Sequence, residues 1–198
     1  MTARNMLQSV LETQRLLVRR FAPEDWTAVA AYATDASVMA YIEEGVLTEE
    51  QVRAFIARNM TAEAQAFPVI LKADRQLVGH MIFHPWFAPR TYEVGWVIHP
   101  ACQGHGYAPE AAQALLRYAF AELHAHRVVA TCQPENRPSY RVMEKIGMRR
   151  EGHFRQCIYR GDGVWWDEYF YAILAEEWQQ LTGGDGRFSF PAAHSSEP

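Results

Sequence analysis

The chain has 198 residues, of which 49% are hydrophobic and 21% charged, and these proportions are typical of one soluble globular domain. Its net charge of -4 argues against a nucleic-acid partner, which needs a basic face, and suits a cationic substrate such as an amine better. No apolar run is long enough to span a bilayer and residues 1–10 lack the pattern of a secretory signal, so we expect a cytoplasmic protein without a membrane partner.

The N-terminal third of the chain predicts one strand followed by two helices. Residues 1–12 show no periodic pattern, and we expect a loose leader there. Apolar side chains alternate with arginine over residues 15–21, which predicts a strand. Pro23 and the two acidic residues after it predict the start of a helix, and the capping-box spacing of Thr48 and Gln51 predicts the start of another.

An acidic loop and a hairpin come next. Residues 40–47, between the two helices, contain Glu43 and Glu44. These carboxylates could attract a cationic substrate, or they could belong to an ordinary solvated loop. Two apolar runs, residues 67–71 and 76–83, flank a short polar turn and predict a β-hairpin.

The centre of the chain predicts a strand, a glycine loop and a helix. Side chains alternate over Thr91–Ile98 as in a half-buried strand, and Gly95 inside it predicts a bulge. Gly104 and Gly106 then leave the backbone bare. Pro109 suits the first turn of a helix that begins one or two residues earlier.

The C-terminal third predicts a buried strand, a helix and a second hairpin. Arg127–Cys132 is a short apolar run whose place after a strand and a helix indicates a parallel crossover. Asn136 is a favourable N-cap for the next helix, and Gly147 is a favourable stop. Residues 148–159 and Val164–Leu174 are joined by an Asp-Gly turn, which favours a hairpin.

The predicted order of elements is β, α, α, β, β, β, α, β, α, β, β. This order indicates a mixed α+β sheet of the α/β class, with an antiparallel front and one parallel crossover. We expect a single domain over residues 13–180. The change to glycine, serine and proline beyond it predicts a flexible tail over residues 181–198.

The glycine loop is a candidate phosphate site. Bare backbone before a helix start offers unpaired N–H groups and the positive end of the helix dipole, although glycines also make ordinary strand-to-helix turns. Two familiar nucleotide loops fit poorly, because no Gly-Lys-Ser/Thr ending is present and Pro109 stands where the third glycine of G-x-G-x-x-G belongs.

Two motifs resemble those of the GNAT acetyltransferase superfamily. Gln103, Gly106 and Ala108 match its acetyl-coenzyme A loop, Gln/Arg-x-x-Gly-x-Gly/Ala, and residues 136–148 resemble its Asn-x-x-Ser-x-x-Val/Leu-x-Glu-Lys-x-Gly-Phe helix. Three further segments resemble the ribosomal-protein N-terminal acetyltransferase (RimJ/RimL-like) branch: residues 15–19, 38–42 and 167–178. The resemblance covers roughly residues 12–178.

The resemblance implies a fold and a reaction. The fold is a mostly antiparallel sheet, flanked by helices and splayed at a parallel pair formed by Thr91–Ile98 and Arg127–Cys132. The reaction moves an acetyl group from acetyl-coenzyme A directly to a primary amine, on a small molecule or a protein N-terminus, in a ternary complex. A backbone N–H near Val97 would stabilise the charge that develops on the carbonyl oxygen.

The resemblance also implies where the coenzyme binds. The pyrophosphate would lie on the glycine loop and the pantetheine along the edge of the preceding strand, where backbone groups can pair with its amides. The residues expected to bind the coenzyme are Val97, Ile98, His99, Gln103, Gly104, His105, Gly106, Tyr107, Ala108, Asn136 and Ser139.

The catalytic candidates are Glu93 and Ser139. At neutral pH an alkylammonium must lose a proton before its nitrogen can attack, and Glu93 is a candidate base, either directly or through water. Glu93 could instead face solvent or pair with an arginine. Many family members place a tyrosine acid where this chain has Met143, so the resemblance favours the Ser139 hydroxyl as hydrogen-bond donor to sulfur, with Tyr140 and Tyr107 as alternatives.

Other chemistries are less well supported by the sequence. The histidines lack helical H-x-x-x-H spacing and a nearby carboxylate set, and the three cysteines lack C-x-x-C spacing, so we expect no metal site. An acyl-cysteine route through Cys102 beside His105 is a rival to direct transfer. A coenzyme-A-bound sensor or interaction module without activity is the alternative function.

The sequence leaves the acceptor and the oligomeric state open. Trp86, Phe87, Trp165 and Trp166 could wall the acceptor pocket, or pack in the core or in a dimer interface. Either a monomer or a homodimer is compatible with the sequence.

Overall fold

The computed structural model describes residues 11–183, and the leader and tail expected from the sequence lie almost entirely outside this range. Leu11 and Glu12 pair with the next strand, and Thr182 ends a C-terminal helix that the sequence analysis did not predict. The elements are β1 (Leu11–Glu12), β2 (Leu16–Val18), η1 (Pro23–Asp25), α1 (Trp26–Ala33), α2 (Ala36–Met39), α3 (Glu49–Arg58), β3 (Ala66–Leu71), β4 (Leu77–Pro85), β5 (Thr91–Ile98), η2 (Pro100–Cys102), α4 (Tyr107–Arg117), η3 (Tyr118–Glu122), β6 (Arg127–Cys132), α5 (Arg137–Lys145), β7 (Arg149–Gly161), β8 (Val164–Leu174) and α6 (Ala175–Thr182).

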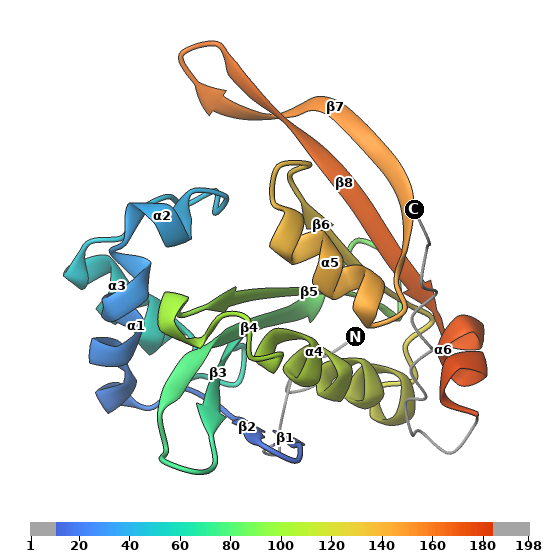
Figure 1. Ribbon diagram of the computed structural model, residues 1–198, viewed down its shortest axis with the longest axis horizontal. Coiled ribbons are helices and arrows are strands. Elements are labelled where there is room, and N and C mark those ends of the chain that lie inside the picture. The colour runs from blue at the N-terminus through green and yellow to red at the C-terminus, as the bar shows by residue number, and fades with distance from the viewer. Residues whose placement is uncertain (1–10, 184–198) are drawn as a thin grey trace, which may run out of the picture.

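One sheet of eight strands organises the described part of the chain, in the order β1-β2-β3-β4-β5-β6-β8-β7. Every neighbouring pair is antiparallel except β5 and β6, which run parallel. Helices α4 and α5 lie over the sheet on the side facing the viewer of Figure 1, whereas α1, α2 and α3 gather beside its N-terminal strands. The predicted mixed fold with one parallel pair is confirmed.

Two apolar clusters hold these helices to the sheet. The larger one joins α4 and α5 to the strands through fully buried side chains such as Leu115, Leu116 and Ile146. The other joins α1 and α3 to the sheet through Val29, Tyr32 and neighbouring side chains. Burying apolar surface on both sides of the sheet explains why its central strands are nearly continuous apolar runs.

The splay between β5 and β6 begins after Glu93, the third residue of β5. The two strands pair only from Thr91 to Glu93 on β5, although β5 continues to Ile98 and β6 continues to Cys132 against β8. The bulge predicted at Gly95 is wrong, because β5 pairs with β4 in unbroken register from Tyr92 to Ile98. The splay therefore arises from divergence of two regular strands, and it leaves one edge of β5 open.

Local sequence signals account for most helix boundaries. Thr48 and Gln51 form the predicted capping box of α3. The Asn136 side chain accepts a hydrogen bond from the Ser139 N–H at the start of α5. Helix α4 begins at Tyr107, as Pro109 predicts.

Candidate functional site

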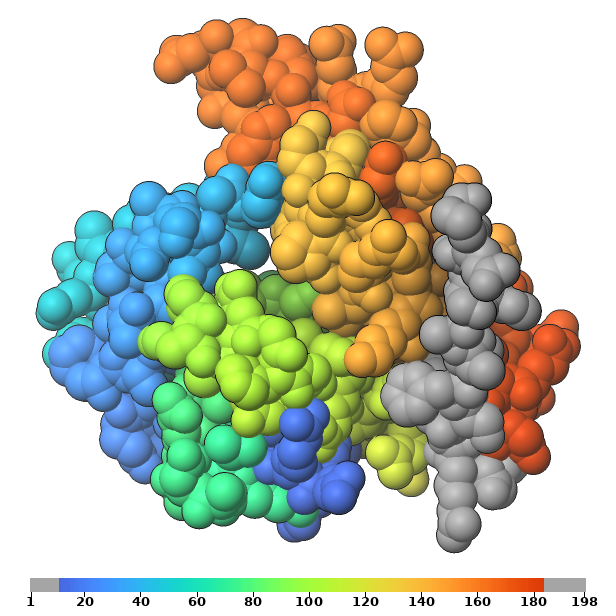
Figure 2. All heavy atoms as spheres, viewed as in Figure 1, coloured from blue at the N-terminus to red at the C-terminus, as the bar shows by residue number. Residues whose placement is uncertain are grey.

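A groove of about 610 Å³ opens between β5, the start of α4 and α5. Figure 2 shows the molecule hollowed here, between the blue segment that contains α2, the green start of α4 and the yellow-orange α5. The structure brings most of the residues predicted to bind the coenzyme onto this groove: Val97, Ile98, Gln103, Gly104, Gly106, Tyr107, Ala108, Asn136 and Ser139.

The two remaining candidates, His99 and His105, turn their side chains to other partners. The His99 Nδ1 atom accepts a hydrogen bond from the Ala101 N–H, 3.2 Å away. The His105 ring stacks on Tyr107, and its Nδ1 atom lies 2.9 Å from the carbonyl oxygen of Gln103. Their imidazoles are therefore engaged with the loop itself, which leaves their backbone groups as the candidates for coenzyme contact.

The glycine loop has the geometry of an anion site. Gly104 and Gly106 have φ values of +78° and +79°, which side-chain-bearing residues rarely adopt. Gly106 is the N-cap residue of α4, and no side chain caps that end of the helix among the described residues. The first N–H groups of a helix have no partner within it, so this end offers donors and the positive pole of the helix dipole to the groove.

The open edge of β5 presents alternate backbone groups. The N–H of His99 donates to the Val78 carbonyl on β4 at 2.9 Å. Because backbone groups alternate between the two edges of a strand, the N–H groups of Ile98 and Trp96 point to the opposite edge, which β6 has left. The same alternation turns the Val97 N–H toward β4, so the N–H groups of its neighbours Trp96 and Ile98 are the candidates for the oxyanion donor expected near Val97.

A second cavity, of about 400 Å³, continues from the groove through the splay. Five residues line both spaces: Tyr41, Ile42, Trp96, Asn136 and Ser139. Four carboxylates face this second cavity: Glu43, Glu44, Glu93 and Glu168. We call it the acceptor cavity; its cationic or titratable basic side chains are Arg58 and His84.

Glu93 lies at the apex of the splay. It is the last residue of β5 that pairs with β6, and its side chain is 26% exposed. Burial raises the pKa of Glu93, and the charge of Glu43 raises it further, while His84 and a hydrogen bond with Thr131 oppose the shift. A carboxylate with a raised pKa is a stronger base at neutral pH.

Glu168 is a second carboxylate at the apex, and no catalytic role was expected for it from the sequence. Burial raises the pKa of Glu168, and the charges of Glu93 and Glu43 raise it as well. Thr131 on β6 hydrogen-bonds with both Glu93 and Glu168. The pairing of β5, β6 and β8 is what brings these three side chains together, and no local sequence motif indicates it.

The predicted acids differ in their placement. Ser139 lies where the groove and the acceptor cavity meet, and its side chain hydrogen-bonds with the buried Cys132 thiol, whose pKa burial raises to about 12. The Tyr140 hydroxyl instead accepts a hydrogen bond from Arg137 at 3.2 Å, and its ring packs against Tyr169. Met143 is a buried residue of α5 and also lines the acceptor cavity.

The rival chemistries gain little from the structure. Within residues 11–183, no group of three or more His, Cys, Asp or Glu side chains is arranged to hold a metal ion. Cys102 is buried and its pKa is raised by that burial, so little thiolate is available for attack.

No helix within residues 11–183 is long and apolar enough to cross a membrane.

The aromatic residues singled out as a wall for the acceptor pocket lie elsewhere. Trp86 packs on Phe170, and Phe87 is 82% exposed beside it. Trp165 packs on Tyr159 in the β7–β8 hairpin. Tyr41, Phe55 and Trp96 are the aromatic residues of the acceptor cavity instead.

Known proteins share this fold and much of this sequence. The family described as "Acetyltransferase (GNAT) domain" matches residues 15–149. The chain is 56% identical over 168 residues to "Uncharacterized N-acetyltransferase YnaD" of Bacillus subtilis, covering 85% of this chain and 98% of that one. A solved GNAT-family acetyltransferase from Bacillus anthracis is also 56% identical, with a TM-score of 0.82 over 85% of this chain and 99% of that one.

More distant relatives carry named acceptors. The "[Ribosomal protein uS5]-alanine N-acetyltransferase" of Escherichia coli is 31% identical over 85 residues, 43% of each chain. A spermidine N-acetyltransferase from Vibrio cholerae, solved with CoA and spermine, shares the fold at 20% identity, with a TM-score of 0.71 over 83% of this chain and 98% of that one. Taken with the fold and the family match, these likenesses show that the chain belongs to the GNAT superfamily of N-acetyltransferases, with ribosomal-protein acetyltransferases among its more distant relatives.

Proposed function

We propose that the protein transfers the acetyl group of acetyl-coenzyme A directly to the primary amine of a cationic acceptor. The observation that carries the proposal is the meeting of two cavities at Trp96, Asn136 and Ser139. One cavity ends at a bare glycine loop and a helix start, which suit phosphates; the other ends at carboxylates, which suit an ammonium.

The described residues fit the coenzyme along the whole groove. The loop from Gln103 to Ala108 supplies backbone donors for the pyrophosphate. The open edge of β5 supplies N–H groups at Trp96 and Ile98 for the amides of the pantetheine arm, as an added strand would use them. The thioester would then lie at the junction of the two cavities, within reach of Asn136 and Ser139.

Glu93 is the proposed base. Its raised pKa suits it to take the proton of the acceptor ammonium, directly or through one water molecule. The amine nitrogen then forms its bond to the acetyl carbon, and an open-edge N–H of β5 donates to the carbonyl oxygen as charge develops there. The carbon–sulfur bond breaks, the nitrogen gives up its remaining excess proton, which the departing thiolate takes up, and Ser139 donates a hydrogen bond to that sulfur.

The charge of the acceptor cavity selects the class of acceptor. Glu43, Glu44, Glu93 and Glu168 outnumber its basic side chains, and the relatives with named acceptors are named for an alanine of ribosomal protein uS5 and for spermidine. We therefore propose that the acceptor carries positive charge, either as a small amine or as a protein N-terminus.

An acceptor panel tests the proposal. The purified protein is incubated with acetyl-coenzyme A and with polyamines, amino acids, aminoglycosides and N-terminal peptides, and the release of free thiol is followed. We expect release with cationic primary amines, and release reduced to the rate without acceptor when the same amines are already acetylated. No release above that rate with any acceptor would contradict transferase activity toward these classes of amine.

A further inference from the structure

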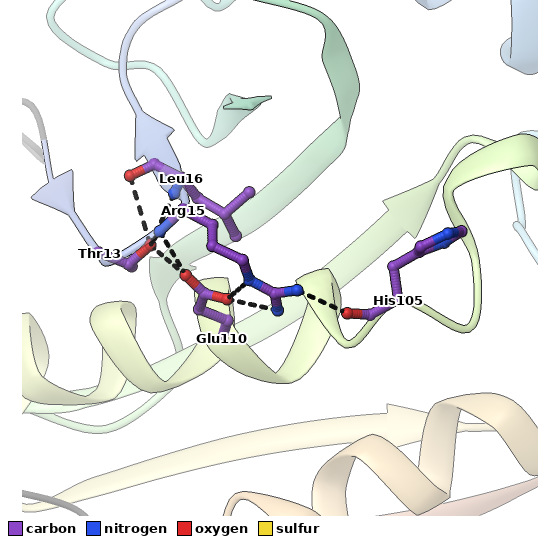
Figure 3. A network of polar contacts seen from close by, with 5 residues as sticks. All are labelled: Thr13, Arg15, Leu16, His105 and Glu110. Atoms are coloured by element: carbon purple, nitrogen blue, oxygen red, sulfur yellow. Dashed lines mark hydrogen bonds and ion pairs between the residues drawn. The ribbon is translucent and has the colours of Figure 1, made fainter. Parts of the chain in front are cut away.

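The glycine loop is fastened from outside the groove by the turn between β1 and β2. In Figure 3, Arg15 reaches from this turn to Glu110 in the first turn of α4 and to the backbone of His105. Arg15 Nε donates to Glu110 at 2.7 Å, and Arg15 Nη2 lies 2.6 Å from the same carboxylate. The remaining guanidinium nitrogen, Nη1, donates to the His105 carbonyl oxygen at 3.0 Å.

Glu110 gathers donors from the turn as well as from the guanidinium. The Thr13 hydroxyl and the Arg15 backbone N–H both donate to its Oε1 atom. Burial alone would raise the pKa of Glu110, but the hydrogen bonds from Thr13 and Arg15 lower it. Lys72 on the adjoining loop donates to the Thr13 carbonyl at 2.7 Å, so the turn itself is tied to the sheet.

The contact with the His105 carbonyl sets the direction of the next N–H. In a planar trans peptide, the carbonyl of one residue and the N–H of the next point in opposite directions. Because Arg15 holds the His105 carbonyl, the Gly106 N–H must point away from Arg15. Gly106 lines the coenzyme groove and Arg15 does not, so this orientation suits a donor to a bound phosphate.

We propose that Arg15 is a positioning residue for the coenzyme: held by Glu110 and Thr13, it locks the 105–106 peptide with its N–H directed at the pyrophosphate. The inference rests on the proposed coenzyme site, to which it adds a residue outside the groove. An ordinary exposed ion pair contributes little to stability, and the feature that distinguishes Arg15 is its additional grip on the loop carbonyl. Glycine leaves the loop backbone freer to rotate, so an external contact on the His105 carbonyl favours one orientation of the 105–106 peptide.

The test distinguishes recognition of the phosphates of acetyl-coenzyme A from recognition of its thioester. Arg15→Met removes the guanidinium, and Arg15→Lys keeps the charge but loses the planar fork that reaches Glu110 and His105 together. Arg149→Met is the matched control, because it removes a comparable exposed arginine. Arg149 does not line the groove, and its Nε atom lies 2.6 Å from the Glu177 carboxylate. Coenzyme A affinity is measured by calorimetry, and turnover is measured with acetyl-coenzyme A and with S-acetyl-N-acetylcysteamine, a thioester without phosphates.

We expect both Arg15 variants to bind coenzyme A about tenfold more weakly and to raise the KM for acetyl-coenzyme A to the same degree. Turnover of the phosphate-free thioester by the Arg15 variants should change less than twofold. Arg149→Met should leave turnover with both acetyl donors unchanged. Unaltered coenzyme A affinity in both Arg15 variants, or an equal loss with both donors, would overturn the inference. Should Arg15→Met fail to fold, Arg15→Lys and Glu110→Gln carry the test. A wild-type protein that binds no coenzyme A would refute the coenzyme site itself rather than the role of Arg15.

Discussion

Gly106→Glu is the substitution that tests the coenzyme site most directly. Gly106 has a φ of +79°, and a side chain at this backbone angle costs about 1 to 2 kcal/mol. A Cβ atom there would meet only the Arg15 Nη2 atom, at 3.5 Å, so the added atom fits and the cost is one of backbone strain. The new carboxylate would also place a negative charge on the loop that is proposed to hold the pyrophosphate.

The electrostatic part of the effect is the larger one. Two like charges about 5 Å apart repel by about 3 kcal/mol at an effective dielectric constant of about 20. This repulsion weakens binding about 100-fold, whereas the backbone strain lowers the stability of the free and the bound protein alike. The effect therefore exceeds what loss of a single neutral hydrogen bond would cause.

Thermal unfolding in the presence of coenzyme A measures the change. At a ligand concentration of about 100 times Kd, the wild-type protein gains about 2.7 kcal/mol, which raises the Tm of a chain of this size by roughly 5 to 11 °C. A 100-fold loss of affinity leaves about 0.4 kcal/mol, a shift of roughly 1 °C. Gly163→Glu is the control, because Gly163 has a φ of +77°, no atom within 4 Å of its added Cβ, and a place in the β7–β8 turn. Retention of the full coenzyme-induced shift by Gly106→Glu would refute the proposed site.

Three further predictions concern the chemistry. Glu93→Gln should lower kcat by about 100-fold with little change in the KM for acetyl-coenzyme A, because the general base is lost while the groove is intact. Steady-state kinetics measure both constants, and an unaltered kcat would exclude Glu93 as the base. Glu168→Gln should raise the Tm at pH 7, since the raised pKa of Glu168 means that folding stability is lost as pH rises through that pKa, and the substitution removes the charge. It should also move the acidic limb of the pH–rate profile to lower pH, because the charge of Glu168 no longer helps to hold the proton on Glu93; a profile that stays in place would show that the two carboxylates act independently. Cys102→Ala should retain turnover within about threefold, because burial raises the pKa of the Cys102 thiol. An acyl-cysteine route would instead abolish turnover in this variant, and mass spectrometry of the wild-type protein would then detect an acetylated Cys102.

Much of the geometry of the proposed coenzyme site follows from local sequence. The glycines of the loop, Pro109 in the first turn of α4 and Asn136 at the start of α5 each act on their own backbone within a few residues, so their structural effects could be predicted. The parallel pairing of β5 and β6 also follows from the order strand, helix, strand. The end of that pairing at Glu93 does not, because no residue type signals where two regular strands diverge.

The acceptor cavity is formed by contacts between segments that lie far apart in the sequence. Glu93, Thr131 and Glu168 belong to three strands, and only the register of β5, β6 and β8 brings their side chains together. Arg15 and Glu110 are separated by 95 residues, and neither carries a local signal of their pairing. The sequence by itself indicated the order of most elements and the glycine loop that is proposed to receive a phosphate, because turn and cap chemistry is local. Only the tertiary structure decided which carboxylates line the acceptor cavity and which arginine contacts the glycine loop, because strand register depends on packing over the whole sheet.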